Sequence, residues 1–167
     1  MTIAPQAKSE WKDSHVHPPG FRARRGLNWF TIGLLYATFY MCRYNFRFAG
    51  SGMRAEFGWD AQQIADLAGW FSLAYGTGQL VNGLFSDRIG GRATMLIGAI
   101  GTIVLNLIIG FSPFTSTFSV FAMLWMINGY LQASGAPGMV KTNAAWFNRD
   151  ERGVFAGIFG FMIQSGQ

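Results

Sequence analysis

Residues 93–140 read ATMLIGAIGTIVLNLIIGFSPFTSTFSVFAMLWMINGYLQASGAPGMV and contain no Asp, Glu, Lys, Arg or His. A bilayer core about 30 Å thick is crossed by about 20 mostly apolar residues of helix, and a helix satisfies its own backbone hydrogen bonds in lipid. The stretch is long enough for two such helices. Pro113 lies among small polar residues, a pattern typical of a turn. The sequence therefore predicts membrane spans over 93–111 and 118–140.

Uncharged stretches extend this pattern in both directions along the chain. They cover residues 26–42, 67–86 and 153–167. We therefore expect two earlier spans, over 27–49 and 63–85, and the beginning of a fifth span over 153–167. The prediction is four complete transmembrane helices and the start of another.

Composition agrees with this interpretation. Only 13% of the 167 residues are charged, against roughly 25% in soluble domains. A soluble helical bundle is the alternative, and it would need polar outer faces at helical period. Apart from apolar side chains, residues 95–111 contain only Gly, Thr and Asn. The predicted fold class is an all-α integral membrane bundle.

Basic residues gather on one side of the predicted spans. Ten of the 13 Lys and Arg residues lie before the first span or in the connections after the second and fourth spans. They are Lys8, Lys12, Arg22, Arg24, Arg25, Arg88, Arg92, Lys141, Arg149 and Arg152. Because Lys and Arg accumulate in short cytoplasmic loops, we expect a cytoplasmic N-terminus and a multi-pass location in the plasma (inner) membrane.

Residues 1–26 form the predicted cytoplasmic tail, ahead of an incomplete transporter bundle over 27–167. The tail contains no apolar core and so does not resemble a signal peptide. Membrane topology also accounts for the net charge of +5, and no nucleic-acid partner is expected. The single cysteine, Cys42, is expected to be an apolar filler within the first span.

The sequence shows no pattern typical of an enzyme. It contains no glycine-rich nucleotide loop, no spacing of His, Cys, Asp or Glu that suits a metal, and no nucleophile beside a base. We therefore expect no catalytic residue, no metal and no cofactor.

The first predicted span carries a polar stripe. Its members are Tyr36, Tyr40, Arg43 and Arg47. At about 100° per residue they fall within an arc of about 60°. Arginine suits phosphate because its planar fork donates two parallel hydrogen bonds. The alternative is that the arginines snorkel to the outer interface; we favour snorkelling for Arg47 and anion binding for Arg43.

The connection between the second and third spans, residues 83–92, reads GLFSDRIGGR. Its order of Gly-x-x-x-Asp-Arg-x-Gly-x-Arg resembles the signature loop of the major facilitator superfamily. The resemblance implies that the loop helps to latch the two halves of a transporter on the cytoplasmic side. The motif residues are Gly83, Asp87, Arg88, Gly90 and Arg92. The chain departs from the pattern at Gly91, where a basic residue is usual.

Further segments resemble one branch of that superfamily, the organophosphate:phosphate antiporters. The matching segments are residues 36–46, 72–76, 128–137 and 146–153. By this resemblance Arg43 corresponds to the phosphate-binding arginine of the branch, and Tyr36 and Tyr40 correspond to tyrosines of the transport pathway. Tyr75 and Gln132 lie in the second and third of these segments and complete the candidate substrate-binding set.

The resemblance implies a secondary active transporter that exchanges an organic phosphate ester for inorganic phosphate by alternating access. Such carriers have twelve spans, so we expect an N-terminal fragment that is inactive alone, with the second half missing and the complete carrier a monomer. Basic residues of glycerol-3-phosphate carriers are replaced by Tyr44, Gln79 and Ile163, which argues against that substrate. Two alternatives stay open: a transporter-like membrane sensor of sugar phosphates, and a carrier of another organic anion.

Overall fold

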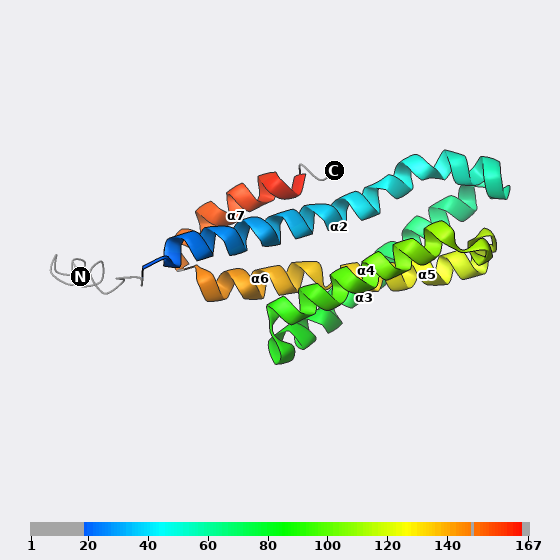
Figure 1. Cartoon of the computed structure of the whole chain (residues 1–167). Coiled ribbons are helices and arrows are strands. Elements are labelled where there is room, and N and C mark those ends of the chain that lie inside the picture. Colours follow the sequence, from blue (N-terminus) through cyan, green and yellow to red (C-terminus); the bar gives the residue numbers. More distant parts are fainter. Residues whose placement is uncertain (1–18, 148, 165–167) are drawn as a thin grey trace, which may run out of the picture.

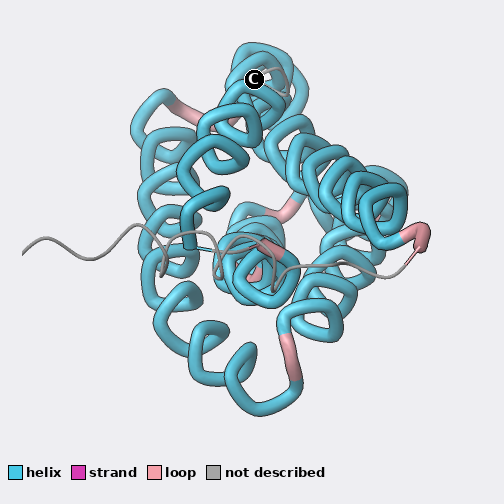
Figure 2. The backbone as a smooth tube through the Cα atoms, turned by 90° about the vertical axis from the view of Figure 1, so that its left-hand side faces the viewer, coloured by secondary structure: helices cyan, strands magenta, loops and turns pink. Residues whose placement is uncertain are grey.

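The computed structural model of the chain describes residues 19–147 and 149–164. Every regular element within these residues is a helix. In chain order they are α2 (Phe21–Phe57), α3 (Ala61–Ile89), α4 (Gly91–Phe111), the short 3₁₀ helix η1 (Pro113–Ser116), α5 (Phe118–Gln132), α6 (Gly135–Trp146) and α7 (Arg149–Gln164). Figure 1 shows α2, α4 and α7 running in one direction along the bundle and α3, α5 and α6 in the other. Figure 2 shows the same helices nearly end-on.

The helix boundaries follow from local chemistry. Asp60 caps α3 in a reciprocal arrangement, in which its carboxylate accepts the Gln63 N–H at 2.7 Å while the Gln63 side chain accepts the Asp60 N–H at 2.9 Å. Such a capping box satisfies two orphan donors of a helix N-terminus. Gly90 alone joins α3 to α4, with φ of 88°, a backbone conformation that glycine adopts without steric cost.

The helix in the first predicted span is longer than expected. The prediction was a span over 27–49, and α2 has 37 residues, about 55 Å at 1.5 Å per residue. Its first turns take in residues that were assigned to the tail. There Phe21 stacks on Trp146 at 5.6 Å and the Arg25 guanidinium lies 5.2 Å from the centre of the Phe147 ring. The predicted tail boundary at residue 26 therefore lies inside a helix, whereas residues 1–18 are outside the described part.

The segment expected as one span over 118–140 is divided into α5 and α6. Pro137 has no N–H to donate to the carbonyl four residues earlier, which disfavours a continuous helix at this point. The carbonyl of Tyr130 accepts a hydrogen bond from the Asn82 side chain at 3.0 Å. A residue of α3 therefore supports the backbone next to the break. The second part, α6, also continues beyond 140 to Trp146.

Helices α4 and α6 approach each other closely through glycine. A Cβ added at Gly91 would lie 2.3 Å from the Gly138 carbonyl oxygen, and one added at Gly138 would lie 2.7 Å from the Gly91 oxygen. Small residues allow such contact between helices. The family resemblance places a basic residue at position 91, and the contact with Gly138 leaves no room for one in this chain.

The outer surface of α4 is apolar. Ile97, Ile100, Ile103, Val104 and Leu107 are each about half exposed. A helix in a soluble bundle would carry polar residues there. Among the described residues one helix, Gly91–Phe111, is long and apolar enough to cross a membrane. The count of four complete spans stays a prediction, since α2 and α3 carry more polar residues and α5 has 15 residues.

Candidate anion-binding site

A cavity of about 240 Å³ lies between α2, α3 and α5. Two arginines lie on its α2 wall, and its lining includes no acidic side chain. The lining residues are Arg43, Tyr44, Phe46, Arg47, Ala68, Phe71, Ser72, Tyr75 and Trp125. The cavity therefore combines positive charge with aromatic walls.

Arg43 is surrounded by aromatic rings. Its guanidinium carbon lies 4.2 Å from the centre of the Tyr75 ring and 4.9 Å from that of Tyr40. The Phe71 ring is 5.7 Å away. Aromatic faces carry partial negative charge and attract a cation at these distances. They reduce the cost of burying the charge without neutralising it.

The polar partners of Arg43 among the described residues are neutral groups. Arg43 Nε donates to Gln132 Oε1 at 3.4 Å, and Gln132 Nε2 donates to Asn128 Oδ1, also at 3.4 Å. Gln132 and Asn128 are fully buried. Among the described residues Arg43 forms no ion pair with a carboxylate. The guanidinium also forms a hydrogen bond with the Tyr75 hydroxyl, so the polar contacts of Arg43 with the described residues are to neutral groups.

Arg47 lines the same cavity as Arg43. Its guanidinium carbon lies 4.8 Å from the centre of the Tyr44 ring, and Tyr44 stacks in turn on Tyr40 at 5.7 Å. Arg47 is exposed and stacks on Tyr44 at the cavity wall, and the preference for snorkelling at this residue stays a prediction.

The two predicted tyrosines of the stripe have different positions. Tyr36 is buried against Phe39 and Phe159 and does not line the cavity. Tyr40 lies between the two groups: its ring is 5.5 Å from that of Tyr36 and faces Arg43. A substrate-binding role for Tyr36 stays a prediction; besides its core contacts, its hydroxyl forms a hydrogen bond with Tyr75, which lines the cavity.

Sequence reasoning missed most of the aromatic wall. Tyr75 and Arg47 were among the candidates, but Phe46, Phe71 and Trp125 were not. The spacing of Ala68, Phe71, Ser72 and Tyr75 along α3 places these four residues on one helical face, and that periodicity was available. No local pattern marks Phe46 of α2 or Trp125 of α5, whose rings stack across the space between the two helices. The side chain of Ile163, where a basic residue was missing, lies outside the described part.

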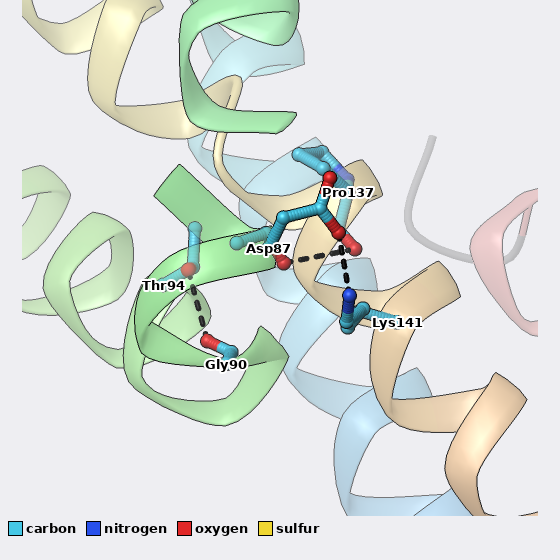
Figure 3. Close-up of polar contacts among 6 residues, drawn as sticks. Asp87, Gly90, Thr94, Pro137 and Lys141 are labelled. Atoms are coloured by element: carbon cyan, nitrogen blue, oxygen red, sulfur yellow. Dashed lines mark hydrogen bonds and ion pairs between the residues drawn. The ribbon is translucent and has the colours of Figure 1, made fainter. Parts of the chain in front are cut away.

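The predicted latch motif lies at the other end of α3. Asp87 forms an ion pair with Lys141 of α6 at 2.5 Å, and Ser86 donates to the Pro137 carbonyl at 3.5 Å (Figure 3). Arg88 and Arg92 are exposed, Gly90 forms the turn, and Gly83 lines a groove beside Asp87. Lys141 was counted for topology and was not expected to pair with the motif. A latch between transporter halves is not tested by these contacts.

Comparisons with known proteins agree with the resemblance in the sequence. A family model described as Major Facilitator Superfamily matches residues 32–167. The membrane sensor protein UhpC of Salmonella typhimurium is 38% identical over 84% of this chain and 31% of its own length. A probable hexose phosphate transport protein of Chlamydia trachomatis is 32% identical over 78% of this chain and 28% of its own.

A third relative, the glycerol-3-phosphate transporter of Bacillus subtilis, is 30% identical over 74% of this chain and 28% of its own length. The chain thus spans about a third of the length of the curated relatives that it matches. No solved structure matches the chain.

Proposed function

The chain belongs to the major facilitator superfamily, in its organophosphate:phosphate antiporter branch, and from this premise we propose that it forms part of a secondary active transporter of an organic phosphate ester. The ester is exchanged for inorganic phosphate by alternating access. The relatives are transport and sensor proteins of this membrane family and not enzymes, which supports a non-enzymatic role.

One observation carries the proposal: the charge of Arg43 has no acidic partner among the described residues. A permanent cation within a membrane bundle is costly unless a counter-charge or water accompanies it. Arg43 faces a cavity that contains a second arginine and no carboxylate. A phosphate ester carries nearly two negative charges and accepts a bidentate pair from one guanidinium. The ligand that best completes this site is therefore a phosphate.

The same feature gives a physical reason for exchange. If Arg43 is neutralised only by a bound anion, the empty carrier has to reorient with an uncompensated charge. That step is expensive in a low-dielectric interior. Loading with inorganic phosphate or with an ester removes the cost, so transport in one direction requires return of the other anion.

We propose further that α2, α3, α4 and the pair α5–α6 each cross the membrane and that α7 begins a fifth crossing. Two halves of six helices rock around a central site in transporters of this kind, and this chain contributes the first part of one half. The cytoplasmic end is the end that holds Arg25, Asp87 and Lys141. Arg25 contacts Phe147 just after α6, which supports a shared location of these basic residues.

Phosphate counterflow tests the proposal. The full-length carrier that contains this chain is reconstituted in liposomes loaded with unlabelled inorganic phosphate, and uptake of labelled phosphate is measured. We expect uptake that depends on internal phosphate and is inhibited by phosphate esters more strongly than by sugar dicarboxylates. Stronger inhibition by the carboxylates would favour a carrier of another organic anion.

A membrane sensor is the second candidate, and the identity with the sensor protein UhpC favours it. A sensor would bind the ester in the same cavity and pass a conformational change to a membrane partner. Binding of a phosphate ester with no counterflow, in a preparation that retains its fold, would support the sensor and contradict the carrier.

A further inference from the structure

We propose that Phe46, supported from behind by Trp125, is a specificity-determining residue that contacts the organic part of the ester and selects a sugar ring. This inference rests on the proposed function, because it assumes that Arg43 holds the phosphate. The juxtaposition that carries it is an aromatic wall one helical turn from Arg43 in the same cavity.

The charged groups and the aromatic groups of the cavity lie on different walls. The α2 wall supplies the guanidiniums of Arg43 and Arg47, and the wall between α2 and α5 supplies Phe46 and Trp125. On a helix, residues three apart are neighbours on the surface, about 5–6 Å between Cβ atoms. A phosphate on Arg43 therefore places the group attached to it beside Phe46.

Phe46 is held in place by stacking. Its ring lies 4.7 Å from that of Trp125 with an angle of 23° between the planes. Trp125 is buried and is also packed on Phe71 at 4.9 Å. Phe46 itself is half-buried and lines the cavity. The exposed part of the Phe46 ring is thus a fixed surface, which costs little ordering entropy when a ligand binds.

The ligand that fits such a surface presents C–H groups on one face and hydroxyls around its edge. A six-membered sugar ring has this form, because its C–H bonds can be directed to the negative face of an aromatic ring. Its edge hydroxyls then meet the polar groups of the cavity, Ser72 and Tyr75.

A short linear ester suits this wall less well. The hydroxyls of glycerol phosphate project on several sides of a flexible chain, and any hydroxyl turned toward Phe46 loses water without gaining a hydrogen bond. Inorganic phosphate has no organic part and does not reach the wall. The wall therefore discriminates among esters while leaving binding of inorganic phosphate unchanged.

The test compares Phe46→Leu with a matched control on the same helix, Phe48→Leu, which alters a ring that is 79% exposed and does not line the cavity. Full-length carrier in lipid nanodiscs is loaded with labelled inorganic phosphate, which is then displaced by glucose 6-phosphate or by glycerol 3-phosphate. Leucine keeps the side chain apolar and of similar size but removes the aromatic face.

In Phe46→Leu we expect affinity for glucose 6-phosphate to fall by about five- to tenfold, the scale of one aromatic contact. Affinity for inorganic phosphate is retained, and Phe48→Leu changes neither. The inference is overturned if Phe46→Leu leaves the ratio of the affinity for glucose 6-phosphate to the affinity for inorganic phosphate unchanged. A parallel fall of both affinities is one such result. Absence of phosphate binding in the unaltered protein overturns the proposed function itself, a result that is distinct from the other two.

Discussion

Arg43 and Lys141 are both cations held where α3 meets another helix, and they differ in their surroundings. Lys141 pairs with the carboxylate of Asp87, and both side chains are well exposed. Arg43 is half-buried, has an amide and aromatic rings around it, and has no carboxylate partner among the described residues. The exposed cation is already neutralised, whereas the enclosed one is left for a ligand. The contrast distinguishes the Asp87–Lys141 contact from the proposed binding site more clearly than residue type does.

Arg43→Lys tests whether the geometry of the unpaired charge matters. Lysine keeps the charge but loses the planar fork, so we expect phosphate affinity to fall by about a hundredfold, since hydrogen bonds to charged groups are worth roughly 1.5–3 kcal/mol. Equilibrium binding of labelled phosphate to the full-length carrier measures this. Arg54→Lys, near the end of α2 and outside the cavity, is the control. Unchanged affinity in Arg43→Lys would contradict the bidentate interpretation.

Gly91→Ala tests the close contact beside the Asp87–Lys141 pair. The added Cβ lies 2.3 Å from the Gly138 carbonyl oxygen, so we expect a loss of stability of about 2 kcal/mol from overpacking. Thermal unfolding in detergent is the measurement. Gly76→Ala is the matched control, because a Cβ at Gly76 meets nothing within 4 Å. Equal melting temperatures for the two variants would show that α4 and α6 are not in tight contact.

Gln132→Glu gives Arg43 the type of partner that Lys141 already has. A carboxylate at this position neutralises the guanidinium and competes with the substrate. Because the empty protein then gains at least one charged hydrogen bond, we expect phosphate affinity to fall by about tenfold. Gln132→Met removes the amide without adding charge and should have the smaller effect. If methionine weakens phosphate binding more than glutamate does, the amide positions Arg43 and its missing counter-charge is unimportant.

Lys141→Ala is expected to have the smallest effect. Exposed ion pairs contribute about 0.2–1 kcal/mol and are screened by salt. We expect a slight fall in thermal stability at low ionic strength that disappears at high salt, and no change in phosphate affinity. A double-mutant cycle with Asp87→Asn isolates the pair. A coupling of several kcal/mol, or a loss of phosphate binding, would mean that this end of the bundle does more than anchor α6 to α3.

The uncharged stretches of the sequence located the helices only approximately: 26–42 lies inside α2 and 67–86 inside α3, whereas 93–140 covers α4, η1, α5 and part of α6. The all-helical fold and the family are confirmed, and Arg43 and Arg47 of the predicted stripe line one cavity. The division between α5 and α6 was missed, although Gly135 and Pro137 signal it locally. Contacts such as Arg43 with Gln132, 89 residues apart, depend on how helices pack, and no periodicity within one helix encodes that. The aromatic wall around Phe46 was missed for the same reason.

The single glycine between α3 and α4 has a consequence for biosynthesis. No loop separates the two helices, so in the proposed topology they enter the bilayer together as one hairpin. Helix α4 is strongly apolar, whereas α3 carries Gln79, Asn82 and Ser86 in its C-terminal half. The insertion machinery therefore meets the pair as a unit, and the favourable transfer of α4 into lipid compensates for the polar groups that α3 needs for its contacts with α5 and α6.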